Sequence, residues 1–389
     1  MKRLIKVVFA LALIGLLVSC GGRRPASQAG AAMPTFTGEP FILPLSAATT
    51  GTNAAIGEEI VYGSQLAVQE INMAGGIRGR ELRLEVIDDQ NIPSEGLNAA
   101  KRAIDQLGTE VLLGPDGSNI VLAALPYAAE HGIPLLATGT NWRVTGSGYT
   151  NVFRFRPNDN TTAVIVSQII RDNRYQRVGY FYSNEDYGLG ALQSLQPLLA
   201  EHGIQFTAIE TCNVGDTDFT AQIMRMINAN LDFIVLFAKE VEGAKYLRQA
   251  YELGLNVPTI TGSSMASNFV MDLATPEAQE GLMTIIPFVA SNPDPIVQDF
   301  VRKYYEKTGI PIPINHAATY YDVVTILGRV LNEYGLSRDD IIRGMREIEH
   351  TGVLTHFKAD EFGDMAVQQS LAVCRNGEWV FHSYVGRRE

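Results

Sequence analysis

Residues 72–89 of the chain read NMAGGIRGRELRLEVIDD, and they join the end of a helix to a strand through a glycine-rich turn. The residues before the turn, 57–74, repeat apolar side chains at helical spacing. This apolar face consists of Ile60, Tyr62, Leu66, Val68 and Ile71. Residues 82–87 instead alternate apolar and polar side chains with a period of two, which predicts a strand. A helix followed by a strand across one short turn is typical of an α/β fold.

The same alternation of strands and helices extends in both directions from this stretch. In the first unit we expect strand 41–46, helix 57–74, strand 82–87, helix 94–107, strand 110–113, helix 118–131 and strand 133–137. The pattern restarts near residue 158, with helices at 160–172, 188–202, 217–229, 241–253 and near 266–273, and strands at 177–182, 204–210, 232–238 and 257–261. The last part is expected to contain helices 295–307, 316–334 and 338–349, then strands 368–374 and 378–385, joined by an Asn-Gly turn. The order predicts two α/β lobes with parallel sheets flanked by helices, joined by several short strands.

Composition narrows the class of protein. The 389 residues are 46% hydrophobic and 19% charged, which excludes a disordered chain and a membrane protein with many spans. The net charge of −11 disfavours nucleic acid as a partner, because an acidic surface repels phosphate. Three cysteines are too few for a disulfide-built scaffold.

The N-terminus has the layout of a secretory signal. Lys2, Arg3 and Lys6 precede twelve apolar residues at 7–18, and a membrane-spanning helix needs about 20. The segment ends in LVSC, which resembles the lipobox of bacterial lipoproteins, whose cleavage leaves a lipid-modified cysteine, here Cys20, at the new N-terminus. A plain signal peptide with an accidental cysteine is the alternative. Cleavage would remove three basic residues and leave a net charge near −14.

The residues behind this signal predict a flexible tether to a membrane. Residues 21–38 read GGRRPASQAGAAMPTFTG, which is small, polar and without apolar periodicity. Cys212 and Cys374 remain in the exported body. Pairing in an oxidising compartment and two isolated buried thiols are both open for them.

Signatures of catalysis and of cofactor binding are missing from the sequence. There is no phosphate-binding G-x-x-x-x-G-K-[ST], no G-x-S-x-G, no H-E-x-x-H and no C-x-x-C. Gly188 and Gly190 begin a dinucleotide-like pattern, but Gln193 stands where its third glycine belongs. We therefore expect no cofactor and no bound metal, and a protein that is not an enzyme.

Small and polar residues follow the expected strands, at the edge where open parallel sheets bind ligands. These strand ends are Gly114 to Ser118, Thr138 to Trp142, Ser183 to Gly188, Lys239, and Gly262 to Ser264. Ser118 also begins a helix, whose free N–H groups favour an anion such as a carboxylate. Each segment alone fits an ordinary cap or turn, but together they predict a binding site.

The opening stretch resembles the signature of type I periplasmic binding proteins of the branched-chain amino acid (Leu/Ile/Val-binding) family. The match consists of Asn72, the sequence GGIRGREL at 75–82, a strand, and Asp88-Asp89. Further matches are Gly114 with Ser118, Gly132-Ile133-Pro134, Asp186-Tyr187-Gly188 and Asp218-Phe219. Together they cover about residues 40 to 385.

The resemblance implies two Rossmann-like lobes, a three-stranded hinge and a ligand cleft between the lobes that closes like a trap. The implied organisation is a signal peptide at 1–19, a lipidated tether at 20–39, lobe one at 40–157 plus 287–364, and lobe two at 158–286 plus 365–387. Cys212 and Cys374 would then share lobe two, which favours the disulfide slightly.

The family's ligand-binding residues carry over in part. Ser118 matches the serine that takes the ligand carboxylate, and Gly139, Thr140 and Asn141 match the backbone site that follows. Tyr187 matches a lobe-two tyrosine that closes over the ligand.

Three positions depart from the family pattern. Where the family has an aromatic residue after the first strand, this chain has Ile56, and where it has a second aromatic residue in lobe two, this chain has Lys239. Where the family has the acidic residue that neutralises the ligand's amino group, this chain has Ser263. A buried ammonium without that acid is costly, and Lys239 would repel it further. A carboxylate without an amine, or a neutral amide, therefore fits better than an ordinary α-amino acid. Alternatively Lys239 points to solvent, or another acid supplies the charge: Glu185, Asp186, Glu240 or Glu242.

The function implied by the resemblance is a lipid-anchored, monomeric substrate-binding protein that hands a small molecule to an ABC permease at a bacterial membrane. Closure around the ligand would be a population shift, with no chemistry involved. A ligand sensor of the same fold that reports to a signalling partner is the alternative. An exported α/β enzyme is a third possibility, against which the missing catalytic motifs argue.

Overall fold

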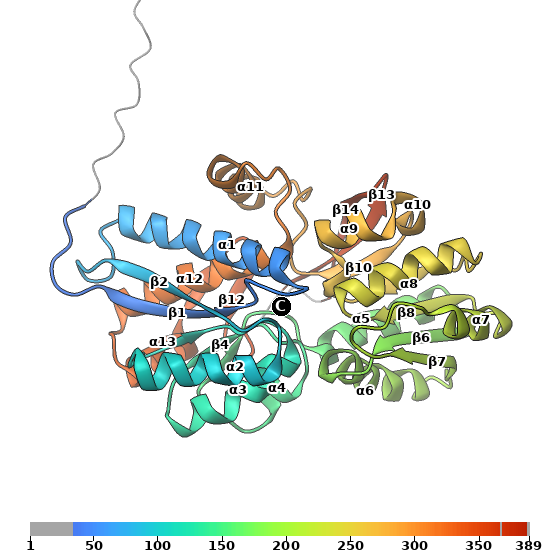
Figure 1. Cartoon of the computed structure of the whole chain (residues 1–389), viewed down its shortest axis with the longest axis horizontal. Coiled ribbons are helices and arrows are strands. Elements are labelled where there is room, and N and C mark those ends of the chain that lie inside the picture. Colours follow the sequence, from blue (N-terminus) through green and yellow to red (C-terminus); the bar gives the residue numbers. More distant parts are fainter. Residues whose placement is uncertain (1–33, 366–367, 387–389) are drawn as a thin grey trace, which may run out of the picture. The chain divides into compact units, whose positions relative to one another are not determined.

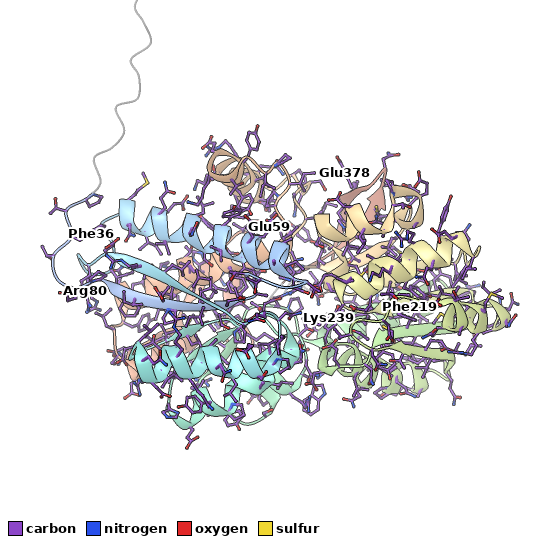
Figure 2. The ribbon with its side chains drawn as sticks, viewed as in Figure 1. Phe36, Glu59, Arg80, Phe219, Lys239 and Glu378 are labelled. Atoms are coloured by element: carbon purple, nitrogen blue, oxygen red, sulfur yellow. The ribbon has the colours of Figure 1, made fainter. Side chains whose placement is uncertain are left out.

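The computed structural model describes residues 34–365 and 368–386, with backbone alone for residues 268 and 269. The expected signal peptide, the lipidated Cys20 and most of the expected tether lie outside this range. The end of the tether is docked on the folded body, since Thr37 N donates to Gly79 O at 2.8 Å and Arg80 Nε donates to Glu39 O at 2.5 Å. Figure 2 shows Phe36 and Arg80 at this end of the molecule. The amino-acid composition of residues 21–38 did not predict this docking, because the hydrogen bonds are accepted by backbone carbonyl groups, which every residue has.

The first sheet has five parallel strands in the order β2-β1-β3-β4-β5. Its strands are β1 (Phe41–Ala47), β2 (Leu82–Asp88), β3 (Leu112–Leu113), β4 (Leu135–Ala137) and β5 (Val152–Arg154). The helices of this part are α1 (Ala54–Met73), α2 (Pro93–Lys101) with a π-helical turn η1 (Arg102–Gln106), α3 (Ser118–Glu130), α4 (Arg143–Gly146), α11 (Pro295–Thr308), α12 (Asn315–Glu333) and α13 (Arg338–Glu347). Helices α1 and α12 cover one face of the sheet, and α2 and α3 cover the other (Figure 1).

The second sheet has seven strands in the order β14-β13-β10-β9-β8-β6-β7. Its strands are β6 (Val178–Ser183), β7 (Phe206–Cys212), β8 (Phe233–Phe237), β9 (Thr259–Thr261), β10 (Met283–Ile286), β13 (Gln369–Arg375) and β14 (Glu378–Val385). Its helices are α5 (Asp159–Asp172), α6 (Asp186–Ala200), α7 (Thr220–Asn228), α8 (Glu240–Glu252), a 3-10 turn η2 (Ser263–Met265), α9 (Asn268–Ala274) and α10 (Pro276–Gln279). Strands β6 to β10 are parallel to one another, and β13 and β14 extend the sheet as antiparallel strands.

Strand composition follows position in the sheet. Every residue of the interior strand β8 (FIVLF) is buried, because helices pack on both of its faces. Phe233 and Val235 join the core beneath α5 and α6, whereas Ile234 and Leu236 join the core beneath α7 and α8. The edge strand β14 instead alternates exposed and partly buried residues. The prediction of helix-covered parallel sheets is confirmed.

The predicted C-terminal hairpin is also confirmed. Strands β13 and β14 pair Arg375 with Glu378, and the two turn residues Asn376 and Gly377 have φ values of 52° and 79°. Positive φ at both central residues is the geometry that an Asn-Gly hairpin turn adopts.

The sequence did not predict the short strands β5 and β10 or the small antiparallel hairpin β11 (Glu349–Thr351) and β12 (His356–Lys358). Each has three or four residues, too few to show a clear period.

Three segments carry the chain from one sheet to the other: 155–158 after β5, 287–294 after β10, and the stretch between β12 and β13. At the first crossing, Arg154 forms a parallel bridge with Asp364 and donates two side-chain hydrogen bonds to it, at 2.8 and 2.7 Å. We propose that lobe one comprises 40–157 plus 287–364 and lobe two 158–286 plus 365–387, because these boundaries leave each sheet within one lobe.

No helix among the described residues has the length and apolar character needed to cross a membrane. Cys212 and Cys374 are both buried and do not form a disulfide. Of the two alternatives for these residues, the structure therefore has the isolated thiols.

Candidate functional site

The carboxyl ends of the two sheets face a common cleft. A pocket of about 320 Å³ lies there between loops of both lobes. Six of the seven predicted ligand-binding residues line it, namely Ser118, Gly139, Thr140, Tyr187, Lys239 and Ser263. The other lining residues are Asp116, Gly117, Thr138, Arg156, Glu240, Ser264 and His316. The prediction from the polar residues that follow each strand therefore identified many of the residues that line this pocket.

The lobe-one wall is built on the N-terminus of α3. No side chain caps this helix, and Ser118 is its first residue. A Cβ on Gly139 would lie 3.0 Å from Ser118 Cα, so a side chain there would crowd the start of α3. Ser118 Oγ accepts a hydrogen bond from Asn141 N at 3.1 Å.

Asn141, the seventh predicted residue, does not line this pocket. Its Nδ2 donates to Asp186 O in the second lobe at 2.6 Å, and its Oδ1 accepts from Arg143 N at 2.9 Å. Asn141 therefore joins the two lobes through its side chain, and its backbone N–H holds the hydroxyl of Ser118.

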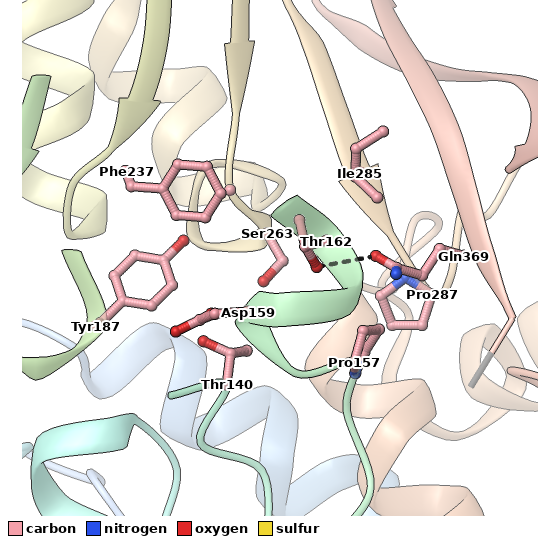
Figure 3. Close-up of a pocket in the computed structure, with 11 residues that line it drawn as sticks. Thr140, Pro157, Asp159, Thr162, Tyr187, Phe237, Ser263, Ile285, Pro287 and Gln369 are labelled. Atoms are coloured by element: carbon pink, nitrogen blue, oxygen red, sulfur yellow. Dashed lines mark hydrogen bonds between the residues drawn. The ribbon is translucent and has the colours of Figure 1, made fainter. Parts of the chain in front are cut away.

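The lobe-two wall centres on Tyr187, in the first turn of α6. Its hydroxyl lies 3.0 Å from Ser264 Oγ, which itself donates to Ala238 O at 2.7 Å. Its ring lies 5.8 Å from that of Phe237, and Figure 3 shows the two rings together at the edge of the cleft. Burial raises the pKa of Tyr187 well above its ordinary value, so the residue stays a neutral hydroxyl.

Lys239 faces the cleft rather than solvent. Its Nζ lies 5.8 Å from the centre of the Tyr187 ring, and 3.4 Å from where a Cβ on Gly117 would stand. Figure 2 places Lys239 where the two lobes meet. Burial opposes its charge, but nearby carboxylates, Glu185 and Glu240 foremost, outweigh burial and raise the pKa of Lys239. The side chain is therefore a cation at neutral pH.

Of the four acids that the sequence offered as a substitute for the missing one, only Glu240 lines the pocket. Burial raises the pKa of Glu240, and its Oε2 accepts from Asn53 Nδ2 of lobe one at 3.2 Å. Glu185 instead caps α6, Glu242 accepts from Gly215 N, and Asp186 pairs with Arg143.

The sequence placed Asp116 at a strand end but did not reveal Arg156 and His316, which form a cluster with it. Arg156 Nη1 lies 3.1 Å from His316 Nε2 and 3.7 Å from Asp116 Oδ1, and Arg156 also donates to Ser263 Oγ. Burial lowers the pKa of His316 to about 4, so its imidazole is neutral. Arg156 follows the unpredicted strand β5, and His316 starts α12, so neither lies at a strand end that the sequence revealed.

A second pocket of about 280 Å³ continues the cleft toward the hinge and shares Thr140, Tyr187 and Ser263 with the first (Figure 3). Asp159 lines it with 2% of its surface exposed, and its Oδ2 has no hydrogen-bond partner among residues 34–365 and 368–386. Burial raises the pKa of Asp159 to about 7. Gln369 Nε2 also lacks a partner within the described ranges. This part of the cleft offers a ligand one carboxyl group and one amide donor.

Metal binding has no support in the described part of the chain, where no three His, Cys, Asp or Glu side chains are grouped to hold an ion. The carboxylates of Asp88 and Asp89 accept hydrogen bonds from nearby turns and do not form a reaction centre. Asp88 accepts from Thr49 N, and Asp89 accepts from Ser46 Oγ and Asn91 N.

Comparison with known proteins identifies the family. The model of the periplasmic binding protein family matches residues 42–375. The chain belongs to this family. The resemblance noted in the sequence is therefore confirmed.

Individual relatives agree with this assignment. A Leu/Ile/Val-binding protein homolog of Brucella suis is 30% identical over 248 residues, which is 63% of this chain and 66% of the relative. The chain thus spans about two thirds of the length of that relative.

Among solved structures of periplasmic binding proteins, the leucine-binding protein LivK of Thermotoga maritima is 26% identical, with a TM-score of 0.81 over 88% of this chain and 98% of LivK. LivJ of Streptococcus pneumoniae, solved with isoleucine, is 24% identical and shares the fold, with a TM-score of 0.83 over 89% and 99% of the two chains.

Proposed function

We propose that this chain is an extracytoplasmic receptor of an ABC importer that binds a small carboxylate-bearing solute in the cleft. The observation that carries the proposal is the meeting of two cations with a helix N-terminus in one pocket. Arg156 and Lys239 both line it, beside Ser118 and the uncapped first turn of α3. An anionic group there gains charge-assisted hydrogen bonds and the favourable helix dipole.

The remainder of the solute is polar rather than branched and aliphatic. No Val, Leu or Ile lines the 320 Å³ pocket, whereas charged and hydroxyl side chains do. The adjoining pocket adds Phe237 and Ile285 but also the buried Asp159. We therefore propose a polar amino acid or a related small carboxylate or amide. If the solute has an amine, Asp159 and Glu240 are its partners. They take the place of the acidic residue that the family pattern has at the position of Ser263.

Binding would act through closure of the lobes. Direct contacts already join them around the pocket: Asn141 with Asp186, Arg143 with Asp186, and Arg156 with Ser263. A solute held by Ser118 on one wall and Tyr187 on the other adds to these contacts only when the lobes are closed. It therefore shifts the population toward the closed form, which a permease partner would recognise.

A thermal-shift screen of the purified protein tests the ligand class. The panel compares Leu, Ile and Val with Asp, Glu, Asn and Gln, and with succinate and glutarate. A true ligand at 100 times its Kd adds about 2.7 kcal/mol of stability. We expect polar carboxylates to stabilise the protein. Stabilisation by the branched-chain amino acids alone would overturn the proposed class.

Reversal of one charge tests the role of Lys239. Lys239→Glu is expected to weaken binding of a carboxylate solute and to shift preference toward amines. Lys245→Glu makes the same charge change on α8 without touching the pocket, and serves as the matched control. If both variants keep the selectivity of the parent, Lys239 does not contact the solute.

We further propose that residues 1–19 direct export and that Cys20 carries the lipid anchor. The basic end, the twelve apolar residues and the LVSC sequence support this. In cells, Cys20→Ala should move the processed protein from the membrane fraction to the soluble fraction. Retention of the variant in the membrane fraction would contradict the anchor.

A further inference from the structure

A third pocket, of about 440 Å³, shares no lining residue with the two pockets of the cleft. Its walls come from the crossing after β10, the residues that lead into α12, the region of η2 and α9, and the turn into β14. The lining residues are Ala266, Met271, Ile286, Phe288, Val289, Ala290, Ile312, Pro313, Ile314, Asn315, Gly377, Glu378 and Trp379. Segments from both lobes, as defined above, therefore enclose it.

Two of the residues that line this pocket carry polar atoms without partners among the described residues. Asn315 is 1% exposed, and neither its Oδ1 nor its Nδ2 has a hydrogen-bond partner in the part of the chain that the structure describes. The indole Nε1 of Trp379 is also buried without a partner. Buried polar atoms are rarely left unsatisfied in folded proteins. Two such side chains from distant parts of the chain, lining one pocket, indicate that a ligand completes their hydrogen bonds.

The surrounding backbone is held in place, so the pocket is not a product of a loose loop. Ser291 Oγ donates to Trp379 O at 3.1 Å and accepts from Phe381 N at 2.9 Å. Asn292 Nδ2 donates to Tyr384 Oη at 2.9 Å. These bonds fix the crossing after β10 against β14, on the side where Trp379 enters the pocket.

We propose that this pocket is a second ligand site, which binds a small neutral molecule with an apolar body and a primary amide. Asn315 Nδ2 and Trp379 Nε1 need acceptors, and Asn315 Oδ1 needs a donor; a carboxamide supplies both. No Lys, Arg or His is among the lining residues, whereas Glu378 is (Figure 2 labels it), and a carboxylate would be repelled. The apolar walls suit a ring or a short hydrocarbon.

The site is linked to the cleft through α12. Asn315 is the first residue of this helix, and the next residue, His316, lines the cleft pocket. An occupant of the third pocket touches segments of both lobes. Any difference in its fit between open and closed forms therefore changes the affinity of the cleft solute, and the effect is reciprocal.

Tryptophan fluorescence gives a direct test, because the chain has only two tryptophans, Trp142 and Trp379. Trp142 is partly exposed, so Trp142→Phe leaves Trp379 as the single reporter at modest cost. Titration of this variant with benzamide should give a saturable change in emission. Adding Asn315→Leu should weaken the apparent affinity about tenfold, since the isosteric side chain removes the hydrogen bonds. Benzoate should bind more weakly than benzamide.

Two further variants keep the test decisive. If Asn315→Leu fails to fold, Ala290→Leu, which enlarges another lining residue and leaves Asn315 itself unchanged, should weaken benzamide binding instead. Tyr187→Ala changes the cleft but none of the residues that line the third pocket, so the benzamide titration should remain saturable. The proposal is overturned if benzamide gives no saturable change, if benzoate binds as well, if neither pocket variant weakens binding, or if Tyr187→Ala abolishes it. In that last case the amide binds the cleft.

Discussion

Gly262, which follows β9, determines where Tyr187 lies in the cleft. A Cβ at this position would stand 2.0 Å from Tyr187 Oη and 2.9 Å from the ring of Phe237. Its φ of −70° suits any residue, so Gly262→Ala adds no backbone strain and acts through the side-chain clash alone. The alanine forces the Tyr187 ring to move and breaks its hydrogen bond with Ser264.

The expected cost is about 2–4 kcal/mol, composed of overpacking and one lost hydrogen bond. Urea unfolding followed by circular dichroism measures this loss of unfolding free energy. Because Tyr187 lines both cleft pockets, its displacement should also weaken solute binding by at least about tenfold, measured by calorimetry with a ligand from the thermal-shift screen.

A double-mutant cycle isolates the contact. In a Tyr187→Phe background the 2.0 Å approach to the hydroxyl is gone, and the 2.9 Å approach to Phe237 remains. Gly262→Ala should then cost at least about 1 kcal/mol less than in the parent protein. An equal cost in both backgrounds would refute the reasoning, because the clash with Tyr187 would not be the cause.

Three other predictions follow from buried groups. Burial raises the pKa of Asp159 from an ordinary value of 3.8 to about 7, so the folded protein holds a proton that the unfolded chain releases between these values. The free energy of unfolding therefore falls as the pH rises through this window. In Asp159→Asn this fall should be smaller by up to about 4 kcal/mol, measured by urea unfolding from pH 4 to 8. An unchanged pH profile of stability in the variant would contradict the prediction. Arg154→Met should cost about 3–5 kcal/mol because Asp364 stays behind unpaired, and adding Asp364→Asn should recover part of the loss; no recovery would speak against the ion pair. Reducing agent should leave the melting temperature unchanged, because Cys212 and Cys374 are unpaired thiols; a clear decrease would show a disulfide.

Local patterns in the sequence predicted the elements that have a long enough period to read. The burial of β8 on both faces appears as the continuous run FIVLF, and the turn at Asn376 and Gly377 appears as a residue pair that tolerates positive φ. Strands β5 and β10, of three and four residues, were missed because neither shows a clear period. Without β5, the sequence also gave no reason to single out Arg156.

The sequence by itself determined the alternation of helices and strands, and with it the polar residues that follow each strand. Ser118, Tyr187 and Lys239 could be named because parallel strands all deliver their carboxyl ends to one edge of a sheet. Only the tertiary structure decided which other polar groups meet them. Arg156 reaches the cleft from the first crossing between the lobes, and Asp159 and His316 reach it from the first turns of α5 and α12. Their placement depends on packing between residues far apart in the chain, on which local periodicity carries no information.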